Sequence, residues 1–253
     1  MKRIYIALYG LIALLPVTSS CAHATPLEGA IAVEAQKPLP FASEIAAFEE
    51  ADKKAFPPTE AVLFIGSSSI RYWTSVAQDF PELPVINRGF GGSQIEDSVR
   101  YADRIVTPYK PKLIVFYAGG NDLNAGKSPE RVLKDFQAFA DKVHKALPST
   151  SLAFISINPS LARWEQEEKI LKVNSLIEKY IRDTNSPTHK LAYIDSHAGL
   201  LGADGQPQAD LLRKDKLHLN ADGYKVWVGI VRPQILALAD SAGVKRLPEP
   251  APK

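Results

Sequence analysis

The stretch VLFIGSSSIRYW, residues 62–73, decides how this chain is expected to fold. It opens with an apolar run typical of a buried strand, and Gly66 marks a sharp turn at the end of that strand. A row of three hydroxyls follows, with Ser68 in the middle. Open α/β sheets hold their ligands at the carboxyl ends of parallel strands. The stretch therefore predicts a strand, a tight turn and a helix, with Ser68 at the ligand-binding edge.

Two interpretations of Ser68 follow from this position. A helix amino terminus stabilises negative charge, so a hydroxyl raised above the sheet is well placed to act as a nucleophile. Serine is also a favoured helix N-cap, and three serines can simply close the turn. The stretch alone favours the cap. A phosphate-binding loop is not indicated, because the glycine-rich pattern ending in Lys-Ser/Thr is missing.

Strand and helix patterns alternate along the rest of the chain. After the first strand at 61–65, apolar runs predict strands at 84–87, 112–117, 152–157 and 191–195, and amphipathic patterns predict helices at 41–54, 95–105, 128–147, 162–183 and 221–238. This alternation predicts right-handed crossovers and a parallel sheet with helices on both faces. We expect an α/β fold, a three-layer α/β/α sandwich whose five-stranded parallel sheet has flavodoxin-like order.

Composition limits the possible functions. The chain has 253 residues, 45% of them hydrophobic, which is enough for one large domain, placed at 41–246. Its 30 basic and 28 acidic residues are spread along the chain, with a formal charge of +2 and no basic run. Nucleic acid is therefore not expected as a partner.

The first residues have the pattern of a secretory signal peptide, with a basic start, an apolar run over 4–17 and a small-x-small site at 22–24. We predict a signal peptide over 1–24 and an exported protein, periplasmic or secreted. Cys21 is the only cysteine. Cleavage after Ala24 would leave no thiol for catalysis or zinc binding, whereas a lipoprotein signal would make Cys21 a lipid anchor. A linker or arm is expected over 25–40 and a proline-rich tail over 247–253.

Three more polar clusters should meet the serine turn at the same edge of the sheet. Gly91 and Gly92 follow the second strand, Gly119–Asn121 follow the third, and 215–218 lie in the last loop. Loops after parallel strands all emerge along one edge, so these residues are expected to converge.

Together the clusters contain the parts of a serine hydrolase. Ser68 would attack an ester carbonyl, His218 would accept and return its proton, and Asp215 would orient the imidazole. The backbone N–H groups of Ser68 and Gly92 and the Asn121 amide would hold the oxyanion. His197, beside Asp195, is a rival base that we rank below His218, and His144, on a lysine-rich helix, is expected to be solvated.

Four blocks carry a family resemblance: FIGSSSI at 64–70, NRGFGG at 87–92, GGND at 119–122 and DKLH at 215–218. In this order they resemble the SGNH hydrolase superfamily, the GDSL-type esterases and lipases. The resemblance implies the same fold, a cofactor-free acylhydrolase with no metal, and the roles just given. The first block usually reads Gly-Asp-Ser, and Ser67 stands where that Asp is expected, so hydrogen bonding at the turn should differ.

Within the superfamily the chain looks closest to the platelet-activating-factor acetylhydrolase-like and carbohydrate acetylesterase branches. That likeness implies a carbohydrate, lipid or small-molecule ester substrate with a short acyl group, acetyl above all. A lysophospholipase or thioesterase is the nearest alternative, and a non-catalytic carbohydrate- or envelope-binding protein on this fold belongs to another class. Asn124, Trp164 and Arg88 are the candidate substrate-binding residues.

Overall fold

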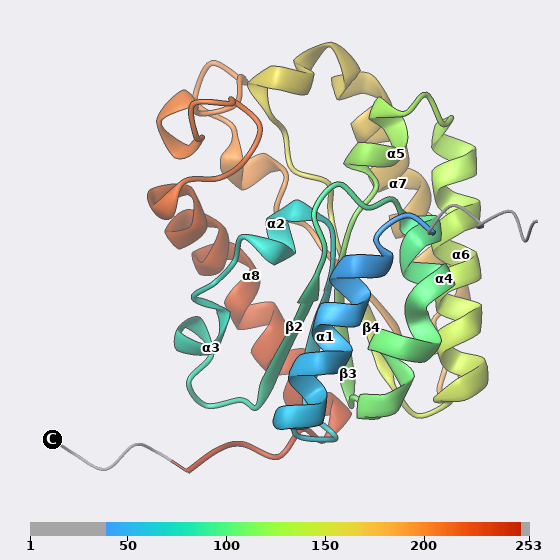
Figure 1. Cartoon of the computed structure of the whole chain (residues 1–253). Coiled ribbons are helices and arrows are strands. Elements are labelled where there is room, and N and C mark those ends of the chain that lie inside the picture. Colours follow the sequence, from blue (N-terminus) through green and yellow to red (C-terminus); the bar gives the residue numbers. More distant parts are fainter. Residues whose placement is uncertain (1–38, 249–253) are drawn as a thin grey trace, which may run out of the picture. The chain divides into compact units, whose positions relative to one another are not determined.

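The computed structural model describes residues 39–248 (Figure 1). The predicted signal peptide, Cys21, nearly all of the predicted linker and the end of the proline-rich tail lie outside this range and stay predictions. Within the described residues, no helix combines the length and apolar character needed to cross a membrane.

A single five-stranded sheet forms the centre of the domain, and all of its neighbouring strands run parallel. The strands are β1 (Val62–Gly66), β2 (Val85–Gly89), β3 (Leu113–Tyr117), β4 (Ser151–Ile155) and β5 (Leu191–Ile194), and their spatial order is β2-β1-β3-β4-β5. Val62 in β1, the second strand of the sheet, pairs with Val85 on one side and Leu113 on the other. The predicted flavodoxin-like order is confirmed.

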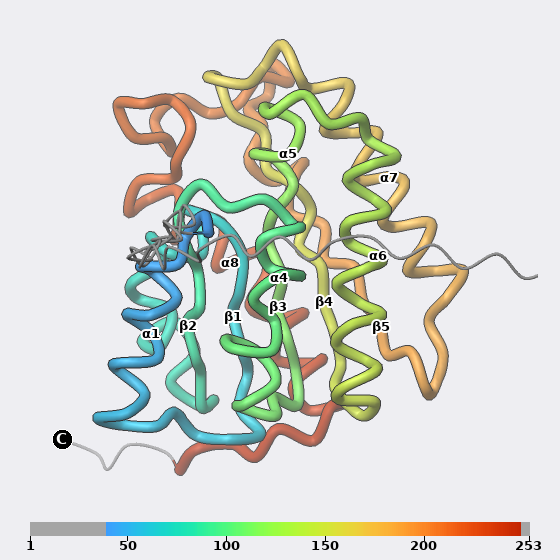
Figure 2. Tube along the Cα trace, turned by 45° about the vertical axis from the view of Figure 1, so that its right-hand side comes forward, coloured from blue at the N-terminus to red at the C-terminus, as the bar shows by residue number. Residues whose placement is uncertain are grey.

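Helices cover both faces of the sheet (Figures 1 and 2). One face packs against α1 (Ala42–Lys54), α4 (Ile95–Ile105), α6 (Pro129–Ala146) and α7 (Glu167–Thr184), and the other packs against α8 (Ala221–Ala242) with the short α2 (Ser68–Arg71) and α3 (Val76–Asp79). Successive β1 residues point to opposite faces and all are buried, which explains why the strand is apolar without alternation.

Several helical segments differ from the prediction. The segment expected as one helix over 162–183 begins as the 3₁₀ helix η2 (Leu161–Gln166), with a break at Arg163 (φ −126°, ψ 21°), before α7. Ala162 donates its N–H to Lys216 O at 3.0 Å, so this backbone is held by another loop. Helix α8 continues through Pro233 to Ala242 and so ends four residues beyond the expected end at 238. Helix α5 (Gly120–Asn124) forms where only a loop was expected.

Gly66 makes the turn after β1 possible. Its φ is +144°, and a Cβ at this position would lie 1.9 Å from the carbonyl oxygen of Tyr117 on neighbouring β3. Only glycine allows this close approach. The turn therefore brings the serine row directly onto the carboxyl edge of the sheet.

Candidate active site

Ser68 is the first residue of α2 and follows β1 with one residue between them. Ser67 occupies the N-cap position, but its side chain makes no capping hydrogen bond. Its N–H donates to Tyr117 O at 3.1 Å, which continues the pairing of β1 with β3 up to the turn. The hydroxyl of Ser68 instead faces the last loop of the domain, so the geometry favours the nucleophile over the cap.

Ser68, His218 and Asp215 form one hydrogen-bonded chain. The Oγ of Ser68 lies 2.8 Å from Nε2 of His218, and Nδ1 of the same ring lies 2.7 Å from Oδ2 of Asp215. This is the order that nucleophile, base and orienting carboxylate need. Of the three neighbouring serines, Ser68 is the one that contacts the imidazole.

The loop that carries Asp215 holds the carboxylate in its charged form. Oδ1 accepts the backbone N–H groups of His218 and Leu217, each at 3.0 Å, while Oδ2 contacts the imidazole. These bonds, the backbone N–H of His218 foremost, lower the pKa of Asp215 well below its ordinary value. The Asp215 side chain is 48% exposed and the His218 side chain only 17%, so water reaches the carboxylate more easily than the ring.

The predicted oxyanion donors lie on segments that hydrogen bonds tie together. Phe90 donates its N–H to Gly66 O at 3.0 Å, and Asn121 Nδ2 donates to Ser93 O at 3.0 Å. Gly92 lies between these anchors with φ +83°. Within residues 39–248 the N–H groups of Ser68 and Gly92 have no acceptor, and Asn121 keeps a second N–H to donate. All three can therefore serve an oxyanion.

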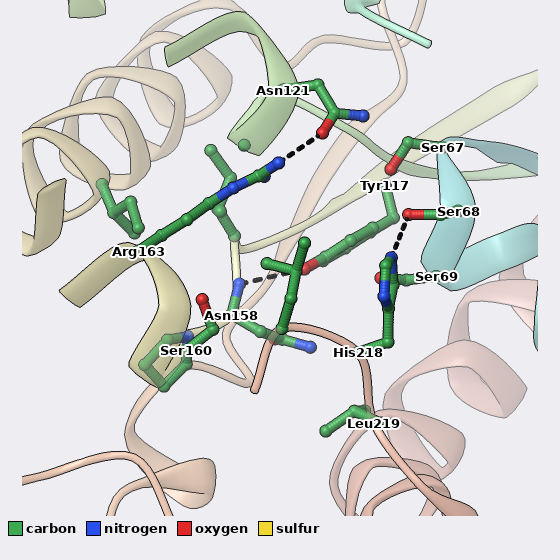
Figure 3. A pocket seen from close by; sticks show the side chains of 15 residues that line it. Ser67, Ser68, Ser69, Tyr117, Asn121, Asn158, Ser160, Arg163, His218 and Leu219 are labelled. Carbon is green, nitrogen blue, oxygen red and sulfur yellow. Dashed lines mark hydrogen bonds between the residues drawn. The ribbon is translucent and has the colours of Figure 1, made fainter. Parts of the chain in front are cut away.

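A small cavity of about 40 Å³ opens beside the triad (Figure 3). Ser68 and His218 lie on one side of it, and Arg163 extends from the opposite side toward Asn121. The lining consists of hydroxyl, amide and apolar groups with one guanidinium: Ser67, Ser68, Ser69, Tyr117, Gly120, Asn121, Ile157, Asn158, Pro159, Ser160, Arg163, Ile170, Leu217, His218 and Leu219.

The three candidate substrate-binding residues do not line this cavity. Arg88 is buried, with its guanidinium against Asp52 and its Nε donating to the Tyr109 hydroxyl at 2.8 Å. Its charge is therefore already neutralised. Asn124 is exposed and accepts a 3.4 Å hydrogen bond from Gln166. Trp164 is half-buried, one residue beyond the arginine that does enter the cavity.

The other histidines have partners away from Ser68. Nε2 of His197 lies 2.9 Å from Oε1 of Glu167, which gives this rival base a carboxylate other than Asp195. The prediction that His144 is solvated is wrong, because its ring is buried against His189 and faces Thr150 O. In the described part of the chain, no cluster of three or more His, Cys, Asp or Glu side chains is arranged to hold a metal.

The sequence analysis did not identify Arg163. Its Nη2 donates to Asn121 Oδ1 at 2.8 Å across the cavity. The local sequence looked like an ordinary charged helix, so no local pattern marked this side chain. The break in η2 and the contact with α5 are what bring it to the site.

The GDSL-like lipase/acylhydrolase family model matches residues 65–226, which is well over half of the chain and contains all four blocks except Phe64. This chain belongs to that family. It is an acylhydrolase, and esterase activity is supported at the level of the family. No match was found among curated proteins.

Solved structures share the fold of this acylhydrolase. A candidate platelet activating factor from Streptococcus pneumonia has a TM-score of 0.67 at 21% identity, over 76% of this chain and 92% of that chain. A GDSL-like lipase from Bacteroides thetaiotaomicron has a TM-score of 0.60 at 20% identity, and the match covers 78% of this chain and 96% of that chain. A carbohydrate esterase of family 3 from Talaromyces cellulolyticus has a TM-score of 0.58 at 18% identity, and the match covers 71% of this chain and 98% of that chain.

Proposed function

We propose that this acylhydrolase is a serine esterase that removes short acyl groups, acetyl above all, through an acyl-serine intermediate. The observation that carries the proposal is the continuous hydrogen-bonded chain from Ser68 through His218 to Asp215.

In the first half of the reaction, Ser68 attacks the ester carbonyl carbon while His218 Nε2 accepts the hydroxyl proton. Asp215, held ionised by its loop, stabilises the imidazolium that forms. The carbonyl oxygen becomes an oxyanion, which the N–H groups of Ser68 and Gly92 and the Asn121 amide would bind. The tetrahedral intermediate collapses when His218 returns the proton to the leaving alcohol oxygen.

In the second half, water replaces the alcohol. His218 removes a proton from the water as its oxygen attacks the acyl carbon, and the same oxyanion donors are used again. Collapse returns the proton to Ser68 Oγ and releases the acid. No group beyond the side chains and backbone amides named here is required for these steps.

The small size of the cavity supports the preference for short acyl groups. A volume of about 40 Å³ leaves room for a few heavy atoms beside Ser68. The likeness to a carbohydrate esterase is consistent with this substrate class. A lysophospholipase or thioesterase would need space for a long chain or a pantetheine arm, and no observation in the described residues favours either.

The test is hydrolysis of 4-nitrophenyl esters from acetate to octanoate by the wild-type protein, Ser68→Ala and His218→Ala. We expect the kcat/KM of the wild-type protein to fall as the acyl chain lengthens. Both variants should have a kcat/KM at least about a thousandfold lower than wild type while keeping the wild-type circular dichroism spectrum. Equal turnover by all three proteins would refute the triad. Highest activity on octanoate would instead support a lipase-like enzyme.

We also propose export, supported by the signal-like pattern of residues 1–24. Mass spectrometry of the mature amino terminus distinguishes cleavage after Ala24 from a lipid on Cys21. An unprocessed Met1 would reject both.

A further inference from the structure

Arg163 places a positive charge in the active-site cavity without a carboxylate to balance it. Among residues 39–248 no acidic side chain lies within ion-pair distance of its guanidinium, and its one hydrogen bond goes to the neutral Asn121 amide. Arg88 makes the contrast clear, because that guanidinium is buried against Asp52. A guanidinium has five N–H donors, so Arg163 has several to spare.

Burial makes this lone charge costly. The side chain is half-buried, and desolvation lowers the pKa of Arg163 from its ordinary value. A guanidinium nevertheless stays protonated at neutral pH, so it cannot escape the cost by losing its proton. A charge that is partly removed from water is stabilised by an opposite charge, and a bound substrate could supply one to Arg163.

The rest of the cavity adds further hydrogen-bond donors and no carboxylate. Asn158 Oδ1 accepts the Ser196 hydroxyl at 2.8 Å, which directs the Nδ2 end of this amide away from Ser196. Ser160, on the same side of the cavity as Arg163, contributes a hydroxyl (Figure 3). No Asp or Glu is among the lining residues. This arrangement suits a group that only accepts hydrogen bonds.

From these contacts we infer that Arg163 binds a carboxylate of the substrate, so that the enzyme prefers esters bearing a negative charge a few bonds from the scissile carbonyl. The planar guanidinium matches the two oxygens of a carboxylate. The small cavity favours this compact anion over larger acidic groups. The inference rests on the proposed esterase function and specifies its substrate class.

The same residue would couple substrate binding to the oxyanion site. One N–H of Arg163 holds Asn121 Oδ1, which leaves the Nδ2 end of that amide to donate. If Arg163 only positions Asn121, replacing Arg163 should lower kcat/KM equally for neutral and charged esters. If Arg163 also binds a carboxylate, the loss should be larger for charged esters.

The experiment compares each charged ester with its neutral amide analogue of nearly the same shape. Methyl hydrogen succinate against methyl succinamate places the charge on the acyl side, and acetoxyacetate against acetoxyacetamide places it on the alcohol side, in each case three bonds from the scissile carbonyl carbon. Wild-type protein, Arg163→Gln and Arg163→Lys are assayed on all four, with Lys214→Gln as a control. Lys214 is exposed beside Asp215 and lies outside the cavity lining, so its variant removes only a nearby charge.

In at least one pair we expect wild-type kcat/KM to be about tenfold higher for the charged ester, because a hydrogen-bonded ion pair forms in the cavity. Arg163→Gln should abolish that ratio, mainly through KM, Arg163→Lys should keep part of it, and Lys214→Gln should leave it within about twofold. The pair that shows the ratio identifies the side on which the carboxylate binds.

Ser68-dependent hydrolysis without a charge preference in either pair would overturn the inference and leave the esterase function intact. Equal losses on charged and neutral esters in Arg163→Gln would likewise overturn it, in favour of positioning alone. Absence of Ser68-dependent hydrolysis of every ester, including 4-nitrophenyl acetate, would instead reject the esterase function itself.

Discussion

The Oγ of Ser68 lies 2.8 Å from Nε2 of His218, although 150 positions separate the two residues in the sequence. Ser68 is held by the turn after β1, and His218 by a loop that reaches back from the far end of the chain to the same edge of the sheet. The contact exists because both segments are fixed independently: Gly66 fixes the first, and the Asp215 carboxylate, through two backbone N–H groups, fixes the second.

Asp215→Asn should lower kcat by roughly two to four orders of magnitude with little change in KM. The amide would present a neutral group to His218 Nδ1, so it would lose the stabilisation of the imidazolium and favour the wrong tautomer. Steady-state kinetics with 4-nitrophenyl acetate measures the effect. Asp222→Asn is the matched control, because Asp222 is exposed and pairs with Lys225. Unchanged kcat in Asp215→Asn would show that the carboxylate only shapes the loop.

Asn121→Ala should reduce kcat by roughly a hundred- to a thousandfold, the usual effect of removing one oxyanion donor. It would also release Ser93 O and Arg163, so some rise in KM is expected for charged esters. Asn124→Ala, three residues along and outside the cavity lining, should stay within about threefold of wild type. A loss in Asn121→Ala confined to KM would argue against the oxyanion role.

Gly66→Ala and Gly229→Ala should shift stability in opposite directions. The first places a methyl group 1.9 Å from Tyr117 O at a φ of +144°, and should cost roughly 2–4 kcal/mol of unfolding free energy. The second adds a methyl group within α8 where nothing lies within 4 Å, and should gain up to about 1 kcal/mol. Urea denaturation of both variants provides the measurement, and a tolerated Gly66→Ala would contradict the described turn.

Stability should fall as the pH drops below about 6.5, the ordinary histidine pKa, in part because of His144. Burial foremost, and then the charge of His189, lower the pKa of His144 in the folded protein. As the pH falls, the unfolded chain therefore binds a proton at His144 before the folded chain does. The contribution of His144 to stability is fully present above its pKa in the unfolded chain, and it is lost as the pH falls toward its lower pKa in the folded protein.

Urea unfolding between pH 5 and 8 tests this for wild type and His144→Gln. The unfolding free energy of the variant should fall less steeply than that of wild type as the pH drops. The difference between the two unfolding free energies at pH 8 gives the packing cost of the substitution alone. Parallel curves would show that His144 does not contribute to the pH dependence.

The sequence predicted the fold well because the interior strands β1, β3 and β4 are buried on both faces. Continuous apolar runs such as the one before Gly66 have few alternative structures, and the alternation of strands with helices restricts the sheet to a few topologies. The predicted ends of helices are wrong where a distant contact holds the backbone. Ala162 is an example, because its N–H donates to Lys216 O instead of extending the helix.

By itself the sequence determined the sheet, its order and the four blocks that place Ser68, Gly92, Asn121, Asp215 and His218 at one edge, because each block is a local signal read directly after its own element. The tertiary structure alone decided what surrounds them. Arg88, beside a glycine loop, looked available to a substrate but is neutralised by Asp52, 36 positions away, whereas Arg163 reaches Asn121, 42 positions away, and enters the cavity. Charge pairing across such distances depends on how helices pack, and no local pattern records it.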